Sequence, residues 1–207
     1  MELALKLLRE LERFRGEYGT EPEIIILKNH GLIATANGAA EVIRLTEAAV
    51  LGFEKLLGAD LSRFKSVSAL SAMLKAAGCA PAAVYRSSDA DLLEALKKKK
   101  PLFFSPPAAP DTLVFCGMNT VEVLPGPRGA AALARYAGRY GEPPKVIIRD
   151  GQLFFTARNM KKAREAEEVY KAHILALMLS KGKARPLSRT ELRYLSRWEA
   201  EKFRQGA

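Results

Sequence analysis

The sequence has no long apolar run, which excludes a membrane-spanning protein. No part of its 207 residues approaches the roughly 18 consecutive apolar residues that a transmembrane helix needs. Its Leu-rich start is not typical of a signal peptide either, because Lys6, Arg9 and Glu12 interrupt it and no small-residue cleavage site follows. With 48% hydrophobic and 27% charged residues, the composition is that of a globular protein with a real core.

Cysteine and histidine are also scarce. The two cysteines, Cys79 and Cys116, are too few for a disulfide framework and too far apart for a CxxC pair. This scarcity predicts a cytoplasmic protein with reduced thiols. Cys116 ends an apolar stretch, so we expect it to be a small buried core residue. His173 shares a helical stripe with apolar residues, and we expect it to be packed there and to bind no metal.

The net charge of +10 raises the question of a nucleic-acid partner. The charges are spread along the expected helices, except for the run Lys97–Lys100. That run is expected to close the last turn of a helix, where cations meet the negative end of the helix dipole. No nucleic-acid motif accompanies it. A solvated charged face is therefore favoured, and nucleic acid is an unlikely partner.

Residues 1–60 show a clear succession of elements. Apolar spacing predicts an amphipathic helix over residues 2–15. A β-branched strand, Ile24–Leu27, comes next, and a turn leads to a second strand near residues 32–35. Asn37 is then expected to cap a long helix over residues 38–57. We interpret residues 1–60 as one part of an α/β domain.

The middle of the chain carries a weaker pattern. Short helices are predicted at residues 66–77 and 88–99, the second capped by Ser88. Proline then excludes a regular helix from residues 101–110. We therefore interpret residues 61–110 as a helical connector.

Residues 111–207 are expected to form a C-terminal extension. Two strands, Thr112–Cys116 and Val121–Leu124, should precede a helix over residues 128–140. A capping box from Ser188 to Glu191 predicts the start of the last helix. The single tryptophan, Trp198, follows in that helix and is expected to be a packing anchor.

A short repeat links the two ends of the chain. The segment Gly141–Asn159 echoes Gly19–Asn37, and each copy reads as strand, turn, strand and helix cap. Internal duplication and convergence are both open explanations. The alignment places Gln152 opposite His30. Because an amide is a poor ligand for a transition metal, the second unit is expected to be structural.

The segment Ile24–Ile33 contains the tripeptide Asn29-His30-Gly31 and resembles the corresponding strand–turn–strand segment of class II aldolase/adducin proteins. Three downstream segments are similar to the extension of longer members, including rhamnulose-phosphate aldolase-like proteins: Pro110–Gly117, Pro143–Ile148 and Arg197–Arg204. The resemblance implies an α/β fold, with a mixed sheet flanked by helices in αβα layers. It also implies that residues 1–60 are the C-terminal part of the class II aldolase/adducin-like domain, which is N-terminally incomplete.

The resemblance further implies a metal site. In the family, the histidine of this tripeptide is a ligand of a catalytic zinc ion, which makes His30 the candidate ligand and Asn29 and Gly31 the turn that supports it. Family members carry an HxH pair and a catalytic Glu upstream. Here only 29 residues precede His30, and none of them is His. The chain is therefore expected to begin partway through the domain and to be inactive alone.

The implied activity is that of a zinc-dependent sugar-phosphate aldolase, a carbon–carbon lyase. Its acid/base residue is unknown, since Glu23 and Glu41 flank the turn and nothing singles out either. The implied partners are a sugar phosphate or another small carbohydrate, together with further copies of the chain or a missing N-terminal segment. A non-catalytic adducin-like scaffold is the alternative. A basic nucleic-acid-binding domain is ranked last.

Overall fold

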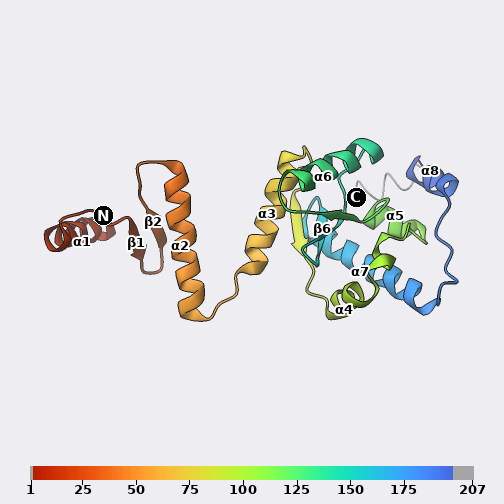
Figure 1. The fold of residues 1–207 in the computed structure, drawn as a ribbon, viewed down its shortest axis with the longest axis horizontal. Helices are drawn as coiled ribbons and strands as arrows, with labels where there is room; N and C mark the ends of the chain where they lie inside the picture. The colour runs from red at the N-terminus through yellow and green to blue at the C-terminus, as the bar shows by residue number, and fades with distance from the viewer. Residues whose placement is uncertain (1, 198–207) are drawn as a thin grey trace. The chain divides into compact units, whose positions relative to one another are not determined.

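The computed structural model describes residues 2–197 (Figure 1). The chain divides into two compact units, Met1–Leu61 and Ser62–Ala207, and each is described by itself. The second unit confirms an α/β protein with a mixed sheet flanked by helices. Among residues 2–197, none of the helices combines the length and apolar character that a bilayer crossing requires.

The first unit is a hairpin between two long helices. Helix α1 (Glu2–Tyr18) precedes strands β1 (Ile24–Leu27) and β2 (Gly31–Ala34), and helix α2 (Ala39–Leu57) follows. The strands pair antiparallel, and α2 lies against both of them. Among the described residues of this unit, only Leu45 is buried. The unit thus has almost no core of its own.

The second unit is built on a four-stranded sheet. The strands are β3 (Ala83–Arg86), β4 (Val121–Val123), β5 (Val146–Arg149) and β6 (Gln152–Ala157). They lie in the order β3-β6-β5-β4, with β4 and β5 parallel and the other pairs antiparallel. The central strands β5 and β6 carry continuous apolar runs, as strands covered on both faces do.

Helices cover both faces of this sheet. On one face, α3 (Ser62–Ala76) and α6 (Pro127–Tyr140) pack against β5 and β6. On the other face, the core is shared by α4 (Ala90–Lys99), the 3-10 helix η1 (Lys100–Phe104), α5 (Pro110–Cys116) and α7 (Met160–Leu179). Helix α8 (Arg189–Arg197) follows α7 and contacts α5 (Figure 1).

Alternate residues of β5 enter the two cores. Ile148 packs with Leu92, Cys116 and Ile174 on the face that α7 covers. Ile147 packs with Leu74 and other side chains on the opposite face. The period of two residues in a strand sends neighbouring side chains to opposite faces, so this one short strand serves both layers.

Residues 61–110, expected as a helical connector, are instead an integral part of the second unit. Strand β3 lies at the edge of the sheet and pairs with β6, and α3 contributes Leu70 and Leu74 to a core. The helix expected to be capped by Ser88 is capped by Asp89, whose side chain accepts a hydrogen bond from the backbone N–H of Leu92. The weak sequence pattern reflects short elements whose partners are distant in the chain.

The strand expected at Thr112–Cys116 is the helix α5, so that prediction was wrong. Pro110 occupies the first turn, where its fixed φ suits a helix and its missing N–H costs nothing. Gly117, at φ 76°, ends the helix. The apolar run is buried in either conformation, and periodicity over so few residues cannot distinguish them.

The two copies of the repeat both fold as a hairpin followed by a helix, but they are not in register throughout. Three residues, Lys28–His30, lie between Leu27 and its partner Gly31. Only Asp150 and Gly151 lie between Arg149 and its partner Gln152. Gln152 is therefore the structural counterpart of Gly31. His30 is the last of the three turn residues in the first copy, which has one turn residue more than the second copy.

The longer first turn also explains why the expected Asn37 cap is wrong. Gly38 occupies the N-cap position of α2, and no side chain caps that helix. In the second copy, Asn159 is the N-cap of α7, and its side chain accepts a hydrogen bond from the backbone N–H of Lys162. Gly38 and Asn159 lie equally far along the chain from the first paired residues after the turns, Gly31 and Gln152. Asn37 lies one residue before this position.

Several local predictions are confirmed. Ser188 and Glu191 form the reciprocal capping box at the start of α8, with backbone-to-side-chain hydrogen bonds of 2.7 and 3.2 Å. The Lys97–Lys99 run lies exposed in the last turn of α4. Cys79 and Cys116 are buried free thiols. Trp198 and most of the similar segment Arg197–Arg204 lie outside the described residues.

Candidate functional sites

The turn that carries His30 is defined by its backbone. The His30 N–H donates to the Leu27 carbonyl at 3.0 Å, which closes a four-residue turn. Asn29 has φ 62°, a left-handed value that Asn tolerates better than most residues and that type II turns require at this position. Gly31 has φ 129°, a region that is almost exclusive to glycine. Asn29 and Gly31 therefore have a structural reason to be present.

His30 itself has no such reason, because its side chain is exposed at the tip of the hairpin. The flanking carboxylates are exposed too. Glu41 forms an ion pair with Arg44 at 3.3 Å, and the Glu23 carbonyl accepts a hydrogen bond from Thr35. Neither carboxylate is singled out by its surroundings as an acid/base residue.

The donor set around His30 does not fit a complete zinc site. A catalytic zinc ion typically takes three protein ligands. Within residues 2–197, no group of three or more His, Cys, Asp or Glu side chains is arranged to hold a metal ion. A zinc ion at His30 would need at least two ligands from beyond the described residues or from another subunit.

His173 has the packed role that the sequence predicts. It lies buried on α7, 6.0 Å from the ring of Tyr170 between centroids. Burial lowers the pKa of its imidazole, and a hydrogen bond with the Ser105 backbone opposes that shift only in part. The residue thus connects α7 to the segment before α5 as a neutral core histidine.

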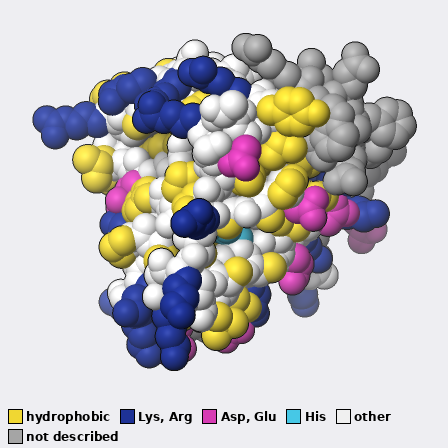
Figure 2. All heavy atoms as spheres, turned by 90° about the vertical axis from the view of Figure 1, so that its right-hand side faces the viewer, with side chains coloured by type: hydrophobic (Ala, Val, Ile, Leu, Met, Phe, Trp, Pro, Cys, Tyr) yellow, Lys and Arg dark blue, Asp and Glu magenta, His cyan; other side chains and the backbone are white. Residues whose placement is uncertain are grey.

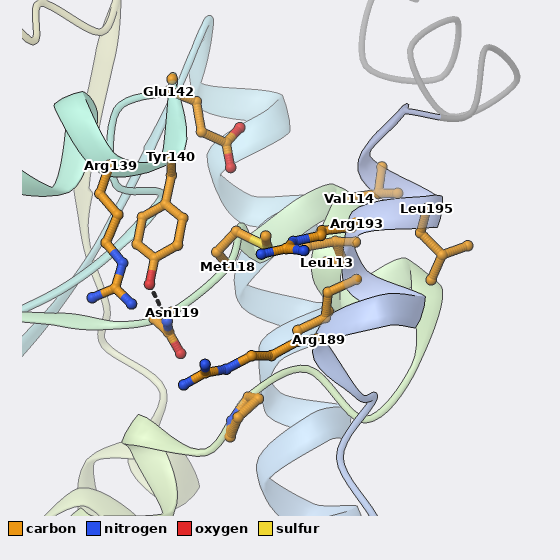
Figure 3. Close-up of a pocket in the computed structure, with 13 residues that line it drawn as sticks. Leu113, Val114, Met118, Asn119, Arg139, Tyr140, Glu142, Arg189, Arg193 and Leu195 are labelled. Atoms are coloured by element: carbon orange, nitrogen blue, oxygen red, sulfur yellow. Dashed lines mark hydrogen bonds between the residues drawn. The ribbon is translucent and has the colours of Figure 1, made fainter.

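The second unit holds a pocket that the sequence did not reveal. Its volume is about 680 Å³, within the range of small-molecule sites (Figure 3). The walls come from α5 and the loop after it, from the C-terminal end of α6 and from α8. The lining residues are Pro106, Leu113, Val114, Met118, Asn119, Arg139, Tyr140, Gly141, Glu142, Arg189, Leu192, Arg193 and Leu195.

Charge is distributed unevenly in this pocket. Three arginines line it, Arg139, Arg189 and Arg193, against one carboxylate, Glu142. Glu142 is ion-paired with Lys145 at 3.2 Å. The pocket therefore carries an excess of positive charge next to apolar walls. Figure 2 shows Lys and Arg side chains gathered in groups on one face of the molecule, with apolar and neutral side chains between the groups.

Asn119 and Tyr140 form one side of the pocket, and Asn119 is hydrogen-bonded to both Tyr140 and the neighbouring Tyr136. The Asn119 amide donates to the Tyr140 hydroxyl at 2.9 Å, and the Asn119 N–H donates to the Tyr136 hydroxyl at 3.4 Å. Burial raises the pKa of Tyr136, which keeps its hydroxyl protonated. The Arg139 guanidinium lies 5.3 Å from the centre of the Tyr140 ring, in cation–π contact.

No motif marks these residues in the sequence, because they come from three separate segments. The one available signal was the pair Arg189 and Arg193, spaced four residues apart on a helix whose capping box is recognisable. That spacing places two arginines on one helical face. It does not indicate that α8 contacts α5 or that its arginines line the same pocket as the end of α6.

Comparisons with known proteins do not place the chain in a family. Neither a protein-family model nor a curated protein matches the sequence.

Proposed function

We propose that this chain is part of a class II aldolase/adducin-like protein, a zinc-dependent sugar-phosphate aldolase in which His30 supplies one metal ligand. One observation carries the proposal. His30 is exposed at the tip of a hairpin whose neighbouring residues, Asn29 and Gly31, are explained by backbone geometry. The imidazole has no packing role there, so a role in binding is the better explanation for it.

The remaining ligands must come from outside the described residues. The proposal therefore requires a further segment or subunit that brings at least two ligands and the acid/base residue to His30. No step of the reaction is assigned to a described side chain, and aldolase activity belongs to the completed assembly. Buried free thiols at Cys79 and Cys116 agree with a reducing, cytoplasmic setting.

The proposal also includes self-association. Large apolar side chains on the first unit are exposed, among them Ile26 at 60% and Leu56 at 77%. Apolar surface of this kind favours assembly with another protein surface. The same observation favours the second candidate function, a non-catalytic scaffold that uses this unit for assembly and binds no metal.

The zinc content of the purified protein distinguishes the two candidates. Elemental analysis should find near-stoichiometric zinc in the assembled wild-type protein and a loss of that zinc in His30→Ala. Lys28→Ala is the matched control, because it changes an exposed residue of the same turn and should retain the metal. A well-folded wild-type protein without zinc would contradict the metal site and leave the scaffold.

A further inference from the structure

We propose that the pocket of the second unit binds a small organic phosphate, a phosphomonoester attached to an apolar body. This inference is separate from the proposed aldolase function, because it involves no residue of the first unit and no metal. It rests on the charge, the fixed geometry and the apolar walls of the pocket.

The pocket has a surplus of guanidinium groups. Arg139 and Arg189 make no ion pair or hydrogen bond with another described residue, apart from the contact of Arg139 with the Tyr140 ring. Figure 3 shows both side chains directed toward the region of Asn119. Guanidinium groups present several donors in a planar fork that matches the oxygens of phosphate. Two such groups facing one concave site favour an anionic ligand there.

Part of this site is already held in place. Arg139 lies over the Tyr140 ring, and the Tyr140 hydroxyl is fixed by the Asn119 amide at 2.9 Å. The ordering of long side chains opposes binding, so an arginine placed before the ligand arrives contributes more to affinity than a free one. The site resembles a preformed anion receptor more than a solvated basic patch.

The apolar walls of the pocket indicate the character of the rest of the ligand. Apolar side chains line the same pocket: Leu113, Val114, Met118, Leu192 and Leu195. A bare inorganic ion would leave these walls in contact with water. A volume of about 680 Å³ suits a ligand with an organic body beside its phosphate.

Glu142 helps to define the ligand class. Its carboxylate lines the pocket and would repel an anion placed beside it, yet its charge is compensated by Lys145 at 3.2 Å. The phosphate is therefore expected to lie toward Arg139 and Arg189. The Glu142 end of the pocket is left for a neutral or hydrogen-bond-donating part of the ligand.

Calorimetric titration of the full chain with phenyl phosphate tests this proposal. The wild type should bind phenyl phosphate at least about tenfold more tightly than inorganic phosphate, which lacks the apolar body, and than phenol, which lacks the charge. Its affinity should fall as salt is added, because the attraction is between charged groups. Benzoate should also bind more weakly, because a carboxylate offers fewer oxygens and less charge to the arginines.

Two variants and a control locate the site. Arg139→Gln and Arg189→Gln should each weaken the binding of phenyl phosphate by about tenfold or more. Both residues are exposed, so folding should survive, and circular dichroism would verify it. Arg128→Gln removes the same charge from an exposed position in the first turn of α6, away from the pocket lining, and should bind as the wild type does.

Three outcomes would overturn the proposal. The first is a wild-type protein that does not bind phenyl phosphate. The second is an equal loss of affinity in Arg128→Gln, which would indicate nonspecific attraction to a basic protein. The third is binding of phenol or benzoate as tight as that of phenyl phosphate, which would exclude a phosphate as the preferred ligand.

Discussion

The two hairpin–helix segments, residues 24–57 and 146–179, have the same local architecture and opposite environments. In the first strand of each, Ile26 is 60% exposed whereas its counterpart Ile148 is fully buried. In the following helix, Leu56 is 77% exposed and Leu177 only 7%. Similar sequences thus form the same elements, while burial depends on what packs around them.

The surroundings of the two segments explain this difference. In the second unit, β5 and β6 lie between β4 and β3, and helices cover both faces of the sheet. In the first unit, α2 lies against a two-stranded sheet, and only Leu45 is buried among its described residues. A two-stranded hairpin with one helix cannot bury much apolar area, so its folding energy must be small.

Turn length adds a second difference. The two-residue turn Asp150-Gly151 has positive φ at both positions, as in type I′ hairpins. The first copy has three turn residues, which shifts everything after the turn by one position relative to the sequence alignment. A one-residue shift in a strand exchanges its two faces, so apparent sequence matches in the second strand do not share an environment.

Core truncation should give the largest contrast between the two segments. We expect Ile148→Ala to lower the free energy of unfolding of the second unit by about 2–5 kcal/mol, because it removes buried methyl groups and leaves a cavity. The matched change Ile26→Ala should alter stability by less than about 0.5 kcal/mol. Urea denaturation followed by circular dichroism measures both. Equal losses would mean that β1 is buried as deeply as β5.

Helix capping should give an intermediate contrast and tests the shifted register. Asn159→Ala should cost about 1 kcal/mol, because the Lys162 N–H loses the side-chain oxygen that it donates to. Asn37→Ala should cost almost nothing, since Gly38 and not Asn37 occupies the cap position of α2. The same denaturation curves report both values. A comparable cost of Asn37→Ala would mean that Asn37 caps α2, as the sequence alignment predicts, and would contradict the shifted register.

Histidine titration should give the smallest contrast. Burial lowers the pKa of His173 below its usual 6.5, so the folded chain takes up the proton at lower pH than the unfolded chain does. Unfolding is therefore favoured as pH falls below about 6.5, and the free energy of unfolding should decrease between about pH 6.5 and 5.5 by no more than about 1 kcal/mol.

His173→Gln should flatten this pH dependence over the same range, whatever it does to the absolute stability. A slope that persists in His173→Gln would assign the acid sensitivity to other groups.

The fold could be predicted from the sequence wherever the signal was local. The β-branched run Ile24–Leu27, the capping box from Ser188 to Glu191 and the buried Cys116 all follow from neighbouring residues. Short elements with distant partners could not be predicted. Strand β3 pairs with β6 about seventy residues later, and α5 was mistaken for a strand because its apolar residues are buried in either form.

The candidate sites likewise differ in whether a local sequence signal marks them. The turn around His30 could be identified because Asn29 and Gly31 mark it locally. The arginine-lined pocket could not, since Arg139 and Arg189 lie fifty positions apart and meet only through the packing of α8. Sequence patterns report local conformation well, whereas pockets arise where distant segments meet.

Hydrogen exchange followed by mass spectrometry tests the central claim most directly, because it compares both hairpin–helix segments in one sample. Amides of β5, β6 and α7 should exchange slowly, with protection approaching the global stability of the second unit. Amides of β1, β2 and α2 should exchange orders of magnitude faster. Equal protection in the two segments would contradict the account, because the first hairpin would then have a core as complete as that of the second.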